Sequence, residues 1–271
     1  MTNEQYIEAI EKRHSRRAYK PKHLSQEIKD VIKQMVDVVN ESADLDFLFI
    51  DDATPFFKIF SGKFSMIVIA GPDSQKARED CGYYGESIVL QCVYHGLGTC
   101  WVSGTYNENK VYEAINLATE KRIYAVITIG YAKDSYSLVE KSMYKATHKK
   151  NKSYQDMIEV CDEKLPEAYS YGLSLVEKGP SAVNRRPVKF RYENGVFSGH
   201  VDEPYSDKSV DFGIAKLHFV IGAKAKGVNG KWNFENVFEP IDSRRLKFEP
   251  KDNEEDNEED EINGSTEEEN E

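Results

Sequence analysis

The 271-residue sequence has no long apolar run and no leader-like start. Its most apolar stretch, residues 66–70, has the length of a single strand, far below the ~18 residues of a membrane-spanning helix. The first residues lack the basic-then-apolar order of a signal peptide, and their acidic side chains argue against a transit peptide. We therefore expect a cytoplasmic protein with no membrane partner.

An excess of positive charge is also missing. Thirteen acidic residues and one lysine lie from Glu249 onward, so this segment has a net charge of −12. The whole chain has a net charge of −11, so residues 1–248 have a net charge of +1. A nearly neutral body lacks the basic face that nucleic-acid binding requires, so we expect no nucleic-acid partner. Residues 249–271 contain one apolar side chain, Ile262, and are predicted to form a disordered acidic tail that serves solubility or attracts a basic partner.

Cysteine is scarce, and several catalytic signatures are missing. The four cysteines lie at intervals of 11, 8 and 61 residues, so they form no CxxC pair and match no zinc template. We expect them to be small buried side chains in a reducing compartment: Cys81, Cys92, Cys100 and Cys161. No GxSxG, no HExxH and no motif with paired carboxylates occurs. The sequence therefore predicts no metal site and no catalytic residue.

The first half of the chain alternates between helical and strand-like patterns. A helix is expected over residues 5–16, and a firmer one follows Ser25, a good N-cap whose helix has apolar residues at i, i+3 and i+4. A third helix is expected over residues 84–94. Strands are expected over residues 45–50, 64–70, 101–102 and 123–131. Short connections between these elements suggest an α/β sandwich.

The pattern restarts near Asn151. A helix is expected over residues 165–176, and a hairpin is predicted by two strands, 188–192 and 196–201, around Asn194-Gly195. Residues 211–225 fit a helix or a strand equally well.

An aromatic-Gly pair precedes an apolar run, a glycine turn and a tryptophan in both halves. Gly85 lies 16 residues before Trp101, and Gly213 lies 19 residues before Trp232. This similarity hints at an internal duplication.

Three short segments have residue types suited to a ligand. The basic segment, residues 13–17 (RHSRR), gathers donors suited to a phosphate, although a solvated helix end would look the same. The proline loop, residues 179–187 (GPSAVNRRP), lets the backbone approach a flat ligand, and Asn184 offers both a donor and an acceptor. The glycine turn, residues 95–101 (HGLGTCW), also permits close approach but matches neither a dinucleotide fingerprint nor a P-loop.

Together these segments resemble the nitroreductase family of FMN-dependent oxidoreductases. Arg13-His14-Ser15-x-Arg17 is similar to the family's N-terminal signature, Pro180-Ser181-Ala182-x-Asn184 to its PSxxN loop, and residues 96–101 to its GLGTxW turn. The resemblance spans about residues 6–248. It implies an α+β fold, a three-layer sandwich of mixed, mostly antiparallel sheets flanked by helices.

The order of the motifs departs from the common pattern. In ordinary members the PSxxN loop follows the second helix, whereas here residues 39–43 occupy that place without a proline and the loop comes about 140 residues later. This order is similar to a tandem branch in which one chain holds two degenerate halves, here residues 1–150 and 151–248. Ordinary homodimers build each FMN site from both subunits. We therefore expect a monomer that acts as a pseudo-dimer and binds one FMN.

The resemblance also implies a role for each motif residue. Arg13 and Ser15, beside His14, would hold the FMN phosphate, and Arg17 would lie near flavin N1 and the C2 carbonyl. The cofactor would also meet the backbone of Gly96, Leu97 and Gly98. The other side of the ring would be lined by Pro180, Ser181, Ala182 and Asn184. A basic pair would close the phosphate site, namely Lys149 and Lys150, while Arg186 has no assigned role.

The implied chemistry belongs to the cofactor. NAD(P)H would give a hydride to flavin N5, and a nitroaromatic, quinone or similar small acceptor would then take the electrons in a ping-pong cycle. Two alternatives remain open. One is a flavin-binding or sensing module without reductase activity, and the other is a different flavin reaction, such as a dehydrogenation or a dehalogenation.

Overall fold

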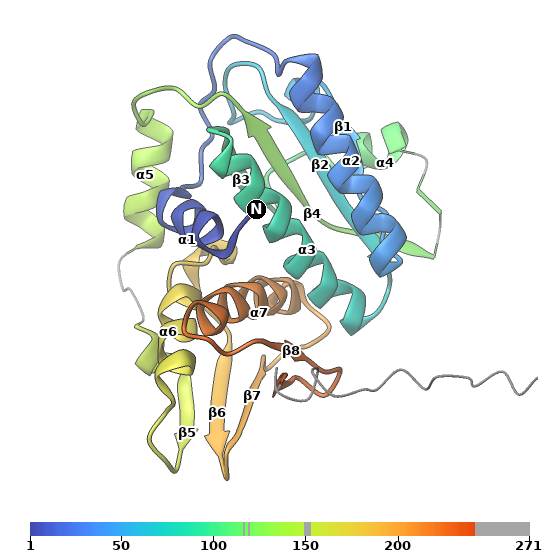
Figure 1. Cartoon of the computed structure of the whole chain (residues 1–271). Helices are drawn as coiled ribbons and strands as arrows, with labels where there is room; N and C mark the ends of the chain where they lie inside the picture. Colours follow the sequence, from blue (N-terminus) through green and yellow to red (C-terminus); the bar gives the residue numbers. More distant parts are fainter. Residues whose placement is uncertain (116, 119, 149–152, 242–271) are drawn as a thin grey trace, which may run out of the picture. The chain divides into compact units, whose positions relative to one another are not determined.

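The fold is built from two β-sheets with helices between and around them (Figure 1). The computed structural model describes residues 1–115, 117–118, 120–148 and 153–241. The predicted acidic tail and Lys149-Lys150 lie outside these residues. Within the described ranges, no helix combines the length and the apolar character needed to span a bilayer.

The first sheet is antiparallel and comes from the first half of the chain. Its strands follow the order β1 (Leu48–Ile50), β2 (Ser65–Pro72), β4 (Lys121–Gly130) and β3 (Gly98–Val102). Strand β2 is buried on both faces, because Ile67 and Ile69 enter one core cluster while Met66 and Val68 enter another. This explains why β2 reads as a continuous apolar run and does not alternate. The helical elements of this half are α1 (Asn3–Lys12), α2 (Gln26–Ala43), η1 (Thr54–Phe56), α3 (Gln75–Tyr94), α4 (Glu108–Ile115) and α5 (Leu138–Thr147).

The second sheet comes from the second half and is mixed. Its order is β5 (Ile158–Cys161), β6 (Lys189–Glu193), β7 (Val196–His200), β9 (Val237–Pro240) and β8 (Gly230–Trp232), with only β5 and β6 parallel. Asn194 and Gly195 both have positive φ, 51° and 75°, as the predicted hairpin turn requires. The other elements are η2 (Tyr154–Met157), α6 (Glu167–Val176), η3 (Ala182–Asn184) and α7 (Asp207–Ala225).

Helices α3 and α7 connect the two halves by crossing at very short distance. A Cβ atom added to Gly82 would lie 2.0 Å from the main-chain oxygen of Val210, and one added to Gly213 would lie 1.8 Å from that of Glu79. Each glycine therefore faces the residue that lies three positions before the other glycine in the sequence. This reciprocal contact pairs Gly213 with Gly82, whereas the sequence comparison pairs it with Gly85.

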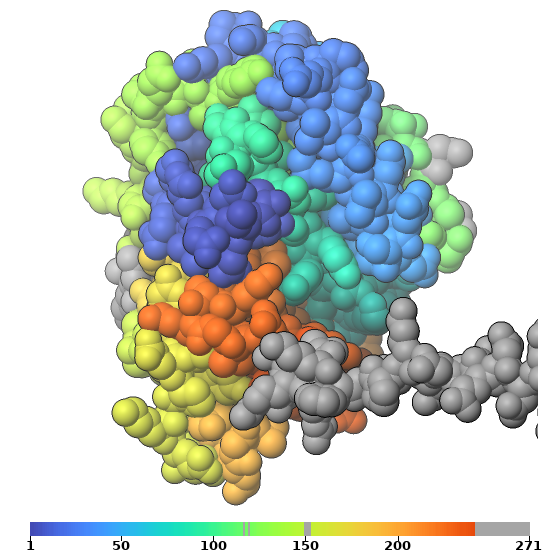
Figure 2. All heavy atoms as spheres, viewed as in Figure 1, coloured from blue at the N-terminus to red at the C-terminus, as the bar shows by residue number. Residues whose placement is uncertain are grey.

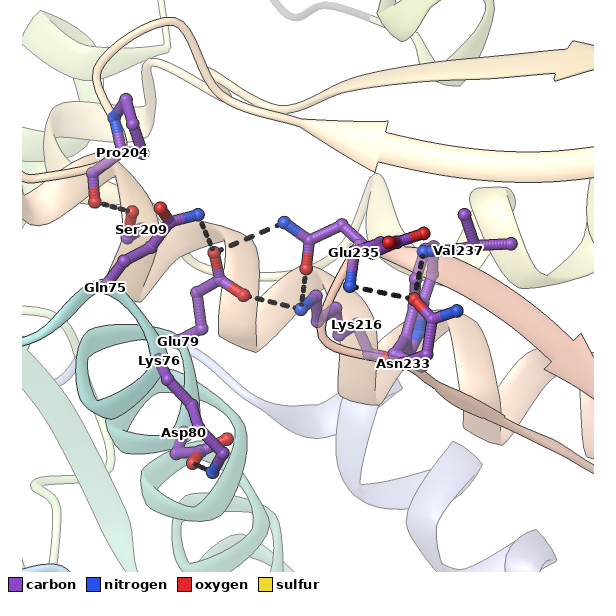
Figure 3. A network of polar contacts seen from close by, with 12 residues as sticks. Gln75, Lys76, Glu79, Asp80, Pro204, Ser209, Lys216, Asn233, Glu235 and Val237 are labelled. Carbon is purple, nitrogen blue, oxygen red and sulfur yellow. Dashed lines mark hydrogen bonds and ion pairs between the residues drawn. The ribbon is translucent and has the colours of Figure 1, made fainter.

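A buried ion pair lies beside this crossing (Figure 3). Lys216 on α7 donates from Nζ to Glu79 Oε2 on α3 at 2.6 Å, and Gln75 donates to the other carboxylate oxygen at 2.9 Å. Asn236, next to β9, contacts both members of the pair. Helix α1 packs against both crossing helices, and Figure 2 shows α1 and α2 on the surface of this face.

The predicted α+β class with mostly antiparallel sheets is confirmed, and three expectations need correction. Helix α1 ends at Lys12, so the basic segment is extended and does not continue the helix to residue 16. Helix α3 begins at Gln75, nine residues before the predicted start, because Ser74 caps it. Cys161 is exposed, whereas the other three cysteines are buried as expected. The ambiguous residues 211–225 are helical.

Candidate functional site

The basic segment runs as an extended chain beside β3. Ser15 pairs with Thr99 in a parallel bridge, and the Arg16 amide donates to the Thr99 oxygen at 2.8 Å. Successive side chains of an extended segment point to opposite sides. Arg16 accordingly turns toward α5, where its Nε donates to Glu140. Arg17, Ser15 and Arg13 lie close to Cys100 on the other side. Burial raises the pKa of the Cys100 thiol, and these three side chains lower it in turn. Arg13, Ser15 and Arg17 therefore share one face.

Glu140 at the start of α5 holds the basic segment in place. Its Oε1 accepts from the Arg17 amide at 2.8 Å, the Ala18 amide at 3.3 Å and Arg16 Nε at 3.1 Å. Burial alone would raise the pKa of this carboxyl, but the hydrogen bonds from Arg17, Ser137 and Arg16 outweigh it and lower the pKa to about 2. The motif search missed Glu140. Its sequence signal is the capping box Ser137-x-x-Glu140, which the structure contains.

The two arginines of the shared face differ in their partners. The half-buried Arg17 guanidinium makes no hydrogen bond or ion pair within the described part of the chain, so it is available to a ligand. Arg13 reaches across to the second half, where its Nη2 donates to the main-chain oxygen of Lys178 at 3.5 Å. Lys178 directly precedes the proline loop. The basic segment and the proline loop therefore meet within one chain.

The proline loop is strained. Val183, Asn184 and Arg186 have positive φ values of 47°, 56° and 44°. This region is costly for a β-branched residue such as Val183, whose side chain is 74% exposed. Such strain persists only where surrounding contacts enforce it, and Arg186 N indeed donates to Ser181 Oγ at 3.0 Å. Strained loops of this kind cluster at ligand sites.

Asp211, near the start of α7, holds the proline loop through two hydrogen bonds. Its Oδ1 accepts from the Ala182 amide at 3.0 Å and its Oδ2 from Arg185 Nε at 3.1 Å. Burial raises the pKa of Asp211 to about 6, although both of these contacts oppose the shift. A cavity of about 20 Å³ lies beside it, lined in part by Gly179, Pro180 and Ser181, which is room for about one water molecule.

The glycine turn is divided between different surroundings. Gly98 lies in β3, where an added Cβ would be 2.7 Å from Ala132 Cβ and 3.2 Å from Arg16 Cβ. Leu97 belongs to the hydrophobic core. Gly96, with φ of 78°, lines an open groove of about 440 Å³ together with Arg16, which points away from the face shared by Arg13, Ser15 and Arg17. The structure thus places Gly98 and Gly96 beside Arg16 of the basic segment, and Leu97 in the core.

The remaining motif residues complete the arrangement. Partial desolvation and the nearby charges of Arg13 and Arg16 lower the pKa of His14. Its ring lies edge-on to Tyr136, with centroids 6.1 Å apart. Asn184 donates to the main chain at the end of α5. No cluster of metal-binding side chains occurs among the residues that the structure describes.

These features fit a flat ligand with a phosphate. Arg17 offers a guanidinium that has no hydrogen-bond or ion-pair partner in the described part of the chain, and Arg13 lies on the same face. The hydroxyl of Ser15 lies on the same side. The loop beyond Gly179 presents small residues and strained backbone. This donor set is suited to a flat ligand that carries a phosphate.

Comparisons with known proteins identify the family of this chain and a similar fold. A family model described as "Putative TM nitroreductase" matches residues 5–223. A crystal structure of a putative nitroreductase from Thermotoga maritima has a TM-score of 0.58 at 21% identity and covers 87% of this chain and 93% of its own. An FMN-dependent nitroreductase from Clostridium difficile has a TM-score of 0.40 at 22% identity and covers 49% of this chain and 93% of its own, a likeness too weak to support the fold. A comparison with curated sequences finds no match.

Proposed function

Because the chain belongs to this nitroreductase family, we propose that it is an FMN-dependent oxidoreductase that passes electrons from NAD(P)H to a small acceptor such as a nitroaromatic or a quinone. The observation that carries the proposal is the contact between Arg13 and the Lys178 oxygen, which joins the basic segment to the proline loop. Both segments resemble FMN-binding motifs, and their meeting supports one complete site per chain.

The residues of the shared face would bind and orient the cofactor. Arg13 and Ser15 would hold the phosphate, since charge-assisted hydrogen bonds to phosphate are the strongest that side chains offer. Arg17 would place a fixed positive charge beside the ring, which stabilises negative charge that develops there. Bound FMN would supply the hydride chemistry. No side chain is assigned a proton-transfer role.

The proline loop would orient the ring from the other side. Pro180, Ser181 and Ala182 bring small side chains to the site, and Asn184 adds a donor and an acceptor. Asp211 and Thr147 fix the loop through main-chain contacts, so its strained shape is held before any ligand binds. Lys149 and Lys150 remain predicted phosphate ligands. Backbone contacts from Gly96, Leu97 and Gly98 to the cofactor also remain a prediction.

We also propose that residues 1–150 and 151–248 are related halves that make the chain a monomeric pseudo-dimer. The reciprocal contact of Gly82 and Gly213 supports this, because a two-fold interface brings equivalent residues together in pairs. With Gly82 as the equivalent position, Trp101 and Trp232 each follow their glycine by 19 residues.

The purified protein tests the function directly. We expect flavin absorbance with about one FMN per chain, anaerobic bleaching by NADH or NADPH, and reoxidation by a nitroaromatic or quinone with ping-pong kinetics. Absence of flavin binding would contradict the proposal as a whole. Flavin that neither nicotinamide reduces would favour the binding module, and a stoichiometry near two would contradict the single site.

A further inference from the structure

A fully buried carboxylate, Glu86 on α3, lies at the point where the two halves meet behind Arg13. Its Oε2 accepts from Trp101 Nε1 at 2.8 Å, and its Oε1 lies 3.0 Å from His218 Nε2 and 3.8 Å from Arg13 Nε. These partners come from β3, α7 and the basic segment. A buried charge is costly unless it is paired, so this arrangement needs a reason beyond stability.

The hydrogen-bond pattern fixes the number of protons in this cluster. His218 Nδ1 lies 2.9 Å from the main-chain oxygen of Leu175, which can only accept, so Nδ1 carries a hydrogen. The contact between His218 Nε2 and Glu86 Oε1 then needs one further hydrogen on either atom. In both cases Glu86 and His218 are neutral as a pair. With Arg13 the cluster carries +1.

Arg13 is oriented from two sides by this arrangement. Its Nε faces Glu86 at ion-pair distance without a hydrogen bond, and its Nη2 reaches the Lys178 oxygen beside the proline loop. Because the guanidinium is planar, fixing these two edges fixes the direction of its remaining N–H groups. A guanidinium held in this way recognises a phosphate at defined geometry.

We propose that Glu86 is a positioning residue for Arg13, and that it directs the guanidinium to the phosphate of the flavin ligand while Trp101 and His218 hold the carboxylate still. This inference rests on the proposed FMN site. It concerns which flavins the site prefers, because riboflavin has the same ring but no phosphate for Arg13 to bind.

The substitution Glu86→Gln isolates this role. The Gln amide oxygen can accept from Trp101, and its NH₂ group can donate to a neutral His218, so the buried hydrogen bonds are kept. The cluster also keeps its charge of +1, since His218 then carries no extra proton. What is lost is the oxygen that faces Arg13 Nε, because the NH₂ group that replaces it cannot accept. A change in phosphate recognition would therefore report the geometry of Arg13 and not its charge.

The measurement is a competition of riboflavin against bound FMN in the purified full-length holoprotein, by equilibrium dialysis with fluorescence detection. We expect Glu86→Gln to lower the FMN-to-riboflavin affinity ratio about tenfold, since a charge-assisted contact of Arg13 is weakened. Affinity for riboflavin itself should stay within about twofold of the wild type. Loss of general packing would weaken both flavins equally.

Glu79→Gln is the matched control. Glu79 lies on the same helix, is buried and pairs with Lys216 of α7, but it does not contact Arg13. It should leave the affinity ratio unchanged even if it lowers the melting temperature. In an Arg13→Ala background, Glu86→Gln should cause no further change in the ratio, because the residue through which it acts is gone.

The possible results separate the two proposals. A wild-type protein that binds no FMN would contradict the proposed function. If the wild-type protein binds FMN, either of two results would overturn the positioning role. One is the same FMN-to-riboflavin affinity ratio in Glu86→Gln and Glu79→Gln. The other is an additive effect of Glu86→Gln on this ratio in the Arg13→Ala background. If Glu86→Gln does not fold, Arg13→Lys tests the same point, because lysine keeps the charge but not the fork. An unchanged ratio in Arg13→Lys would overturn it as well.

Discussion

Asn184 of the proline loop donates from Nδ2 to the main-chain oxygen of Thr147 at 3.2 Å, which ties the loop to the last turn of α5. The first turn of the same helix holds the Arg17 amide through Glu140. Helix α5 has ten residues, about 15 Å, so it links the two candidate motifs along its length. Of its side chains only Glu140 is buried, and Leu138 is 84% exposed. Polar contacts at both ends therefore hold α5.

We predict that Asn184→Ala weakens FMN binding by about fivefold, since it removes a neutral hydrogen bond worth about 1 kcal/mol. The effect on the flavin reduction potential or on turnover should be the larger one. Fluorescence titration and spectroelectrochemistry measure the two. Asn40→Ala is the control, because Asn40 bonds the Phe47 backbone and not a motif residue. A shifted potential in the control would argue against a local effect.

Arg13→Ala should weaken FMN affinity roughly ten- to a hundred-fold, as expected for a charge-assisted phosphate contact. Arg13 and Asn184 belong to one chain, so flavin affinity should not depend on protein concentration. Sedimentation run beside flavin fluorescence over a dilution series tests this. Release of FMN together with dissociation of a dimer would mean that the two residues meet across subunits.

Glu140→Gln should destabilise the fold by about 2 kcal/mol at pH 7. The folded-state pKa is depressed from 4.5 to about 2, so the stabilisation is complete above about pH 5 and is lost as the pH falls toward 2. Urea unfolding of the wild type and the variant between pH 7 and pH 2.5 measures the difference between their free energies of unfolding, which should become smaller as the pH falls. Glu27→Gln, in the exposed first turn of α2, is the matched control for replacing a carboxylate at the start of a helix.

The ionisation of Asp211 should change the free energy of unfolding with pH in the opposite direction to that of Glu140. Its folded-state pKa is raised from 3.8 to about 6, so the unfolded chain ionises first and the free energy of unfolding falls as the pH rises from about 4 to 6. Asp211→Asn should remove this decline while keeping an acceptor for the Ala182 amide. Denaturant unfolding at half-unit pH steps compares the two slopes. Equal slopes would show that Asp211 does not titrate in this window.

Gly82→Ala should unfold the protein or lower its stability by at least about 3 kcal/mol, because the new methyl group would collide with the Val210 backbone. Neither helix can move away without breaking the reciprocal contact at Gly213. Gly104→Ala provides the comparison, since an added Cβ there meets nothing within 4 Å. Thermal unfolding followed by circular dichroism is sufficient. Similar melting temperatures for the two variants would refute the close crossing.

Local features of this protein were predictable from the sequence because they depend on neighbouring residues. Ser25 caps α2 through a hydrogen bond three residues away, and Asn194-Gly195 supplies the two positive φ angles of its hairpin. The motif residues were recognisable for the same reason, since each motif is contiguous. The family and the α+β class followed from these short patterns.

Contacts between distant residues decided the rest. The basic segment leaves the helical path because it pairs with Thr99, and Glu140 is a ligand of its backbone from more than 120 residues away. Helix α7 has no polar face, since it is enclosed by the core and α3, so its periodicity could not separate helix from strand. No motif in the sequence marks Glu86. Only the folded chain gives that carboxylate its partners, because Trp101, His218 and Arg13 approach it from three different elements.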